Sequence, residues 1–231
     1  MSRPGSIVIL LLSNGYPIMT LYLYIVKMED AAVCGRFYIE KDDPTEELLK
    51  IIAEIERKLK DDPDGLHIKQ GEIFPTDIVP VIANNKKRSV EPFAMKWGFS
   101  RFDLSGVVIN ARSETAMEKS MFRQPMMERR CLIPASNYFE WQTAEGKRVK
   151  HAIRDPESPL MYMAGCYRWE KDSKLPLFVI LTRDAAPGIA YIHSRMPVIL
   201  PREAREAWLS DTTDITGVLT AAMNELTAHA V

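Results

Sequence analysis

The sequence predicts an α+β fold: a single β-rich domain with flanking helices. The chain has 231 residues, 46% hydrophobic and 26% charged, which suits one soluble domain with a sizeable core. The stretch 44–60 repeats its apolar residues at helical spacing. Most other apolar residues fall in short runs between polar or turn residues, the pattern of strands. The sequence contains no internal repeat and no low-complexity tract.

The first elements are a short strand at 36–40 and a helix at 44–60. Asp43 is the expected N-cap, with Pro44 at the first helical position. The apolar residues that recur along this helix are Leu48, Ile51, Ile52, Ile55 and Leu59. Their spacing predicts one buried helix face.

The remainder of the domain is expected to alternate strands with short helices. The apolar runs predict strands at 78–83, 90–97, 105–110, 131–134, 159–166 and 177–182. The helical period predicts short helices at 113–119, 202–209 and 214–229. Irregular connections at 70–80 and 183–197 are long enough to carry functional residues.

The two ends of the chain differ from the domain at 34–225. Residues 1–33 have few charges and no amphipathic period, so we interpret them as a leader or an upstream extension, the latter if Val33 is encoded by the alternative start codon GTG. Residues 226–231 are expected to be a tail. The apolar run at 21–26 is too short to span a membrane, and the charge pattern before it is a weak signal-peptide pattern.

Charge and cysteine content narrow the class of protein. A formal net charge of −1 gives no overall signal for nucleic acid, although it permits a local basic groove. Cys34, Cys131 and Cys166 form no CxxC pair. This spacing argues against a disulfide framework or a zinc site and favours a reducing cytoplasm.

Cys34 is the first candidate for chemistry. An N-terminal cysteine carries an amine and a thiol on adjacent carbons, so it can capture an aldehyde first as an imine and then as a thiazolidine. Its amine titrates at about pH 8, so part of it is neutral at pH 7. The alternative reading is a small core residue, the usual place of a free cysteine.

Glu140 and His193 are candidates for proton transfer. Glu140 lies between Phe139 and Trp141, and apolar surroundings raise a carboxyl pKa towards neutrality. His193 can donate or shuttle protons. The alternatives are an outward-facing strand residue for Glu140 and a hydrogen-bonded structural residue for His193.

Three polar or aromatic residues are candidates for binding a substrate strand. Asn110 can hold an amine or a phosphate, and Arg112 offers a bidentate fork for a phosphodiester. Trp97 can stack on an exposed base. Otherwise Asn110 is a turn residue, Arg112 forms a surface ion pair and Trp97 fills the core.

Five segments in this order and spacing resemble the SRAP family (SOS response-associated peptidases), which process abasic sites. They are Cys34-Gly35-Arg36-Phe37, Trp97-Gly98, Asn110-Ala111-Arg112-Ser113-Glu114-Thr115, Pro134-Ala135-Ser136-Asn137-Tyr138-Phe139-Glu140-Trp141 and His193-Ser194-Arg195-Met196-Pro197-Val198. The resemblance runs from Cys34 to about Leu209. It departs from the family where Val33 stands in the place of the usual Met.

The resemblance implies covalent crosslinking of Cys34 to abasic sites in single-stranded DNA, after autoproteolysis exposes its amine, and allows lyase activity through the imine. It implies catalytic roles for Cys34, Glu140, His193 and Asn110. It places Arg36, Arg112, Trp97 and Pro75 at the DNA, with Pro75 as a wedge beside the lesion. It calls for no metal or other cofactor. We expect a cytoplasmic monomer that associates with the nucleoid when bound to DNA.

Two other functions fit the same residues. A cysteine hydrolase using Cys34 and His193 would keep its activity with an N-terminal extension, because a thiol alone suffices. A non-covalent single-strand-binding module with a structural Cys34 would release its DNA completely in denaturant.

Overall fold

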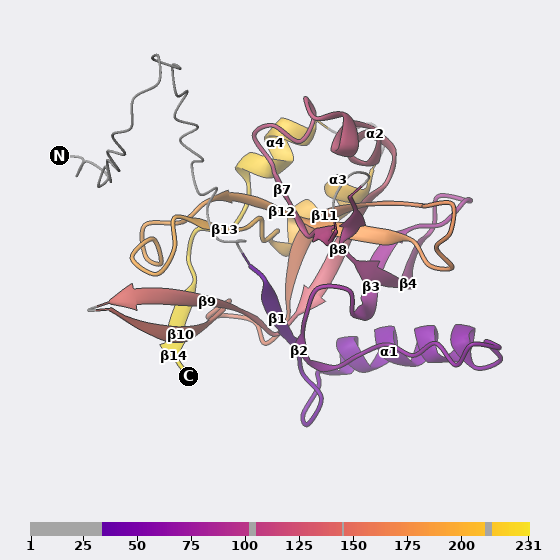
Figure 1. Ribbon diagram of the computed structural model, residues 1–231, viewed down its shortest axis with the longest axis horizontal. Coiled ribbons are helices and arrows are strands. Elements are labelled where there is room, and N and C mark those ends of the chain that lie inside the picture. The colour runs from indigo at the N-terminus through magenta and orange to yellow at the C-terminus, as the bar shows by residue number, and fades with distance from the viewer. Residues whose placement is uncertain (1–33, 102–104, 145, 211–213) are drawn as a thin grey trace, which may run out of the picture. The chain divides into compact units, whose positions relative to one another are not determined.

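The computed structural model describes residues 34–101, 105–144, 146–210 and 214–231. The predicted leader at 1–33, which includes Val33, lies outside the described residues. Within them the α+β prediction is confirmed: two large β-sheets and a small one are flanked by four helices (Figure 1). No helix in these ranges is long and apolar enough to cross a membrane.

One sheet is antiparallel and carries the start of the described chain. Its five strands are, in spatial order, β14 (Thr227–Ala230), β10 (Lys147–Arg154), β9 (Asn137–Ala144), β1 (Arg36–Ile39) and β2 (Gly71–Ile73). β1 pairs between β9 and β2, so the residues that precede it lie beside β9.

The second sheet closes on itself. Its ring runs through β8 (Arg130–Ala135), β3 (Ile78–Asn84), β4 (Val90–Trp97), β12 (Leu177–Asp184) and β11 (Met161–Arg168). β7 (Asn110–Arg112) and β13 (Arg195–Pro197) also pair with β12. A third sheet joins β5 (Phe99–Ser100) and β6 (Val107–Val108).

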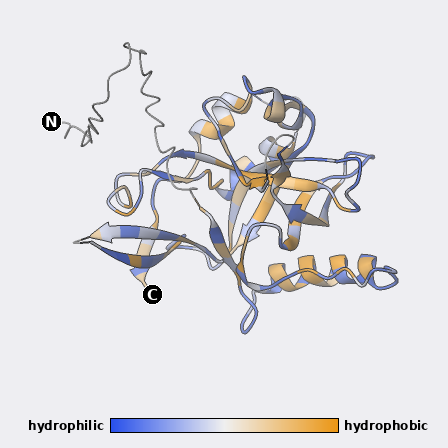
Figure 2. Ribbon diagram, in the orientation of Figure 1, coloured by the Kyte–Doolittle hydropathy of each residue, from blue (hydrophilic) through white to orange (hydrophobic). Residues whose placement is uncertain are grey.

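The ring encloses the core. Every residue of β8 and the first six residues of both β11 and β12 are buried, as expected of nearly continuous apolar runs covered on both faces. Figure 2 shows these strands largely in the hydrophobic colour. Closure also leaves fewer unpaired strand edges exposed to solvent.

Helix α1 (Glu46–Leu59) packs against β3 and β4. It buries Leu48, Ile51, Ile52 and Ile55, which confirms the predicted apolar face (Figure 2). Its start corrects one prediction. Thr45, not Asp43, is the N-cap, because the Thr45 hydroxyl accepts a hydrogen bond from the Leu48 backbone N–H at 3.2 Å.

Several later elements differ from the prediction. The run at 105–110 is divided between β6 and β7, and 113–119 forms turns, with helix α2 (Ser120–Glu128) beginning just after it. The stretch 214–229 contains only a short helix, α4 (Ile215–Thr220), followed by β14. The expected tail at 226–231 therefore contains a strand, because the edge of β10 supplies backbone partners that the local sequence cannot reveal.

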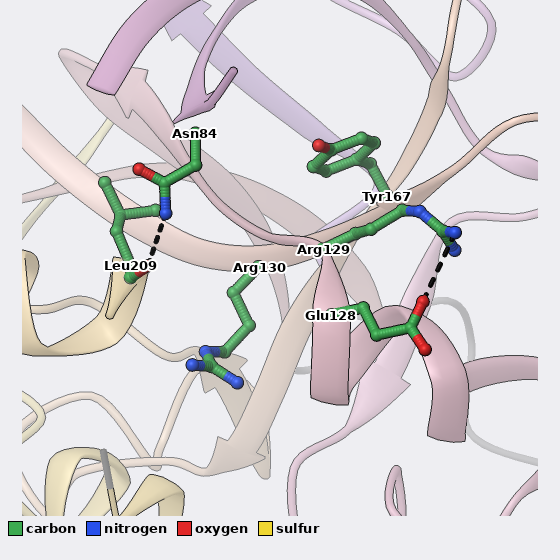
Figure 3. A pocket seen from close by; sticks show the side chains of 6 residues that line it. All are labelled: Asn84, Glu128, Arg129, Arg130, Tyr167 and Leu209. Carbon is green, nitrogen blue, oxygen red and sulfur yellow. Dashed lines mark hydrogen bonds and ion pairs between the residues drawn. The ribbon is translucent and has the colours of Figure 1, made fainter. Parts of the chain in front are cut away.

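Arg130 joins the C-terminal ends of two helices, α2 and α3 (Arg202–Leu209). Its Nε donates to the Trp208 carbonyl at 2.6 Å, and its Nη1 donates to the Met126 carbonyl at 2.9 Å. Its Nη2 donates to the Ser210 carbonyl. Figure 3 shows Arg130 turned away from its neighbour Arg129. One buried cation thus satisfies carbonyl groups that both helices leave unpaired at their ends.

Candidate active site

Strand pairing brings Cys34 next to Glu140. In the antiparallel register of β1 and β9, Arg36 lies opposite Phe139, so the residues before Arg36 lie beside those after Phe139. The Cys34 backbone N–H donates to Oε1 of Glu140 at 2.5 Å. Cys34 is fully buried and Glu140 is 5% exposed, so this contact is shielded from water.

Cys34 has an unusual backbone conformation and a protonated thiol. Its φ of 48° lies in the left-handed region, which L-residues other than Asn and Asp rarely occupy. Burial first, and then the charge of Glu140, raises the pKa of the Cys34 thiol well above its ordinary value. Forming the thiolate here therefore requires help from another group.

The Glu140 carboxyl is suited to accept and return a proton. Burial raises its pKa, and the Cys34 N–H and the positive charge of His193 oppose that rise. The net direction is upward, towards the pH range in which general acids and bases are effective. The sequence prediction of a perturbed carboxyl is therefore confirmed for Glu140.

The electrostatic contact with Glu140 places His193 near the same site. His193 is half-buried in the connection between β12 and β13. Its Nδ1 lies 3.0 Å from the Arg195 backbone nitrogen and 3.3 Å from the Arg195 carbonyl oxygen. The neutral ring can accept a hydrogen bond from the Arg195 N–H, and the charged ring can donate one to the carbonyl, so the same segment can hold either form.

Arg195 organises the site, although no feature of its sequence motif predicts such a role. Its guanidinium donates two hydrogen bonds to the carboxylate of Glu114, at 2.6 and 2.9 Å, and one to Asp184 at 2.6 Å. It also donates to the Thr182 carbonyl at 2.8 Å. Although partial burial raises the pKa of Glu114, the hydrogen bonds from Arg195 outweigh this effect and hold the pKa below its ordinary value. Arg195 thus fastens the His193 segment to the segment that follows β7.

Asn110 and Arg112 are placed by strand pairing beside the residues that Arg195 joins. Both lie on β7, which pairs in parallel with β12 so that Arg112 is opposite Thr182. Asn110 is half-buried and Arg112 is exposed. The Arg195 hydrogen bonds therefore link the strand that carries Asn110 and Arg112 to the segment that carries His193.

Arg36 and Pro75 lie at a surface rich in cations and aromatic rings. The Arg36 guanidinium lies 4.6 Å from the ring centre of Phe74 and 5.1 Å from that of Trp141. Pro75 follows Phe74 in the turn between β2 and β3. Lys150 and Arg148 also face the Trp141 ring, at 5.9 and 5.5 Å. We call Arg36, Phe74, Pro75, Trp141, Arg148 and Lys150 the aromatic rim.

Trp97 is not part of this surface, which corrects the prediction that it stacks on DNA. It is fully buried, and its Nε1–H donates to the Ile109 carbonyl at 3.0 Å. Its ring lies 5.1 Å from that of Phe37, edge-on, and 6.4 Å from that of Phe178, stacked. A base cannot reach a ring packed in this way. Phe74, which is 38% exposed, is the aromatic residue that a base can reach.

Known proteins resemble this chain in sequence and in fold. The family model described as SOS response associated peptidase (SRAP) matches residues 33–231. Among similar proteins, the abasic site processing protein YoqW of Bacillus subtilis is 31% identical over 189 residues, covering 77% of this chain and 80% of its own. The abasic site processing protein YedK of Escherichia coli is 29% identical over 183 residues, covering 77% and 79%.

Two further matches are more distant or partial. The abasic site processing protein HMCES of Rattus norvegicus is 33% identical over 156 residues, covering 51% of this chain and 44% of its own. A crystal structure of a Bacteroides thetaiotaomicron protein superposes with a TM-score of 0.68 at 23% identity, covering 86% of this chain and 92% of that one. The structural match supports the fold. The extent of the family match and the identity to YoqW show that the chain belongs to the SRAP family.

Proposed function

We propose that the protein processes abasic sites in single-stranded DNA by covalent capture at Cys34. The similar proteins named above are abasic site processing proteins, and an abasic site exposes an aldehyde when its sugar opens. The observation that carries the proposal is the 2.5 Å hydrogen bond from the Cys34 nitrogen to the buried Glu140 carboxylate. This contact would hold an N-terminal amine in place. The Glu140 carboxylate would take a proton from the amine and leave its nitrogen lone pair free to attack an aldehyde.

Capture proceeds in two steps. The Cys34 amine adds to the aldehyde carbon to give an amino alcohol, whose hydroxyl group leaves as water with a proton from the charged form of His193. The nitrogen then passes its remaining proton to the neutral His193, which gives the imine. Glu140 releases the proton it took from the amine to solvent and is again a carboxylate. The Cys34 thiol then adds across the imine: sulfur bonds to carbon, and the C=N electron pair takes a proton at nitrogen. Glu140 carries the thiol proton to that nitrogen, so no oxidant or cofactor takes part.

The amine must first be released from the residues that precede it. We propose that the same site hydrolyses the peptide bond before Cys34, because Glu140 already holds the nitrogen that would leave. A buried carboxyl with a raised pKa can protonate that nitrogen as the bond breaks.

The aromatic rim is suited to hold the strand around the lesion. It combines three cations with exposed or half-buried rings, and protein sites for single strands combine these two features. Arg112 would add a phosphate contact beyond the rim. Phosphate contacts position the strand without reading its sequence, which agrees with a target defined by a missing base.

The test is a denaturing gel with a single-stranded oligonucleotide that carries one abasic site. Protein released from a fusion by cleavage directly before Cys34 should give a band that survives boiling, and the Cys34→Ala variant should give none. A band also formed with residues 1–33 attached and uncleaved would favour the hydrolase alternative. DNA that is bound but fully released by boiling would favour the non-covalent module.

The Arg112→Ala variant should weaken DNA binding with a reduced salt dependence. Losing one phosphate contact on a single strand reduces the slope of log K against log salt by about 0.7. Binding should be measured in the Cys34→Ala background, where no covalent product forms. Arg57→Ala, an exposed arginine on α1, is the matched control and should keep the parent slope. An unchanged slope for Arg112→Ala would remove Arg112 from the DNA contacts.

A further inference from the structure

The hydroxyl group of Tyr138 is buried next to the proposed nucleophile without a hydrogen-bond partner. Tyr138 is fully buried, and its hydroxyl oxygen contacts no donor or acceptor among the described residues. Buried polar groups almost always have a partner, because an unsatisfied one costs free energy. Such a group in a native fold therefore calls for an explanation.

The position of Tyr138 points to its use. It precedes Glu140 by two residues on β9, so both side chains lie on the same face of the sheet. Its partner in the β1–β9 register is Phe37, which follows Cys34 by three residues. The same strand pairing that places Glu140 at the Cys34 nitrogen therefore places Tyr138 in the same buried space.

The charges around Tyr138 keep its proton in place. Burial first, then Cys34 and then Glu140, raises the pKa of Tyr138 well above its ordinary value, while Arg183 opposes them. The group therefore remains a neutral O–H at any physiological pH. Its electrostatic partners are the thiol and the carboxyl of the proposed reaction, and both can accept a hydrogen bond when ionised.

We propose that Tyr138 donates a hydrogen bond to the Cys34 sulfur as it closes the thiazolidine ring, an inference that rests on the proposed function. In the resting site the thiol is protonated and needs no donor, so the hydroxyl has no partner. During closure the thiol proton first passes to Glu140, the sulfur then bonds to the imine carbon, and the C=N pair takes that proton at nitrogen. Sulfur is negatively charged after it loses its proton and before its bond to carbon is complete, and the Tyr138 hydroxyl stabilises this charge without losing its own proton.

The experiment compares Tyr138→Phe with Tyr162→Phe. Each change removes one buried hydroxyl, but the Tyr162 hydroxyl has a partner, since it donates to Glu47 at 2.5 Å. Tyr138→Phe should therefore raise the denaturant midpoint of unfolding, and Tyr162→Phe should lower it. Only Tyr138→Phe should slow ring closure.

Closure is separated from imine formation by quenching the crosslinking reaction with borohydride and then alkylating free thiols. Borohydride traps the imine and leaves its thiol open to alkylation, whereas the closed ring takes no label. Mass spectrometry should show imine formation within about twofold of wild type and closure slower by about tenfold or more in Tyr138→Phe, the effect of losing a hydrogen bond to a charged group.

Two results would overturn the inference. One is closure at the wild-type rate in Tyr138→Phe; the other is an equal slowing of both steps together with lower stability, which would mark a structural role. Failure of the wild-type protein to crosslink would instead refute the proposed function itself. The two failures are therefore distinguishable.

Discussion

Crosslinking by the Glu140→Gln variant should be slower by about 100-fold or more, because general acid–base groups contribute about 10²–10⁴ to rates. The amide can still accept the Cys34 hydrogen bond, but it cannot take the amine proton or pass the thiol proton to nitrogen. The measurement is the rate at which the boiling-stable band appears with protein that begins at Cys34. Glu170→Gln, a carboxylate paired with Arg168 at 2.5 Å in the β11–β12 connection, is the matched control and should react at the wild-type rate.

The same variant should show that the rate loss is not a loss of folding. The pKa of Glu140 is higher in the folded protein than in the unfolded chain, chiefly because of burial. Its contribution to stability is therefore fully present below the unfolded pKa and is lost as the pH rises through the folded pKa. Glutamine does not titrate. The stability of wild type relative to Glu140→Gln should thus fall as the pH rises from acid to neutral, as measured by denaturant midpoints. A variant that unfolds more readily at neutral pH, or that crosslinks at the wild-type rate, would contradict this role.

Arg195→Met should lower the free energy of unfolding by about 3 kcal/mol. Losing a hydrogen bond to a charged group typically costs about 1.5–3 kcal/mol. The loss stays near this range, although several bonds are lost, because Glu114 and Asp184 are exposed enough to be hydrated once released. Methionine keeps most of the volume but removes every hydrogen bond to Glu114, Asp184 and Thr182. Chemical denaturation measures the change.

The same substitution should slow crosslinking by roughly tenfold to a hundredfold, because His193 and the segment after Arg112 lose their common attachment. Lys50→Met is the control: it removes an exposed ion pair with Glu46 on α1, and it should leave both stability and crosslinking at wild-type values. A stable Arg195→Met protein with normal crosslinking would show that the attachment has no part in positioning the site.

The parts of the fold that could be predicted are those whose own sequence decides them. The periodic apolar residues of α1 and α3 predicted both helices, and the uniform apolar runs predicted β3 and β4. The turn at 113–119 was mistaken for a helix because Glu114 forms its ion pair with a residue 81 positions away. The strand β14 was missed for a similar reason, since its partner β10 lies far back in the chain. Contacts of this kind leave no local pattern.

The same distinction holds for the site. The structure brings together Cys34, Glu140 and His193. These three residues could be identified from the chemistry of their side chains and from the motifs that resemble a known family. The prediction that Trp97 contacts DNA was wrong because a tryptophan in an apolar run has the same sequence pattern whether its ring is packed or exposed. Only the fold shows the hydrogen bond from its indole N–H to the Ile109 carbonyl. Tyr138 gave no signal beyond its motif, because its missing hydrogen-bond partner is a property of the packed structure.

The left-handed conformation of Cys34 has a consequence for how its amine would be exposed. The torsion angle φ exists only while a carbonyl carbon precedes the nitrogen, so hydrolysis at that bond abolishes the angle altogether. An L-residue in this region stores about 1–2 kcal/mol, which the intact chain holds and the cleaved protein does not. Resealing the bond would have to restore that strain, so backbone geometry shifts the proposed cleavage towards the cleaved form.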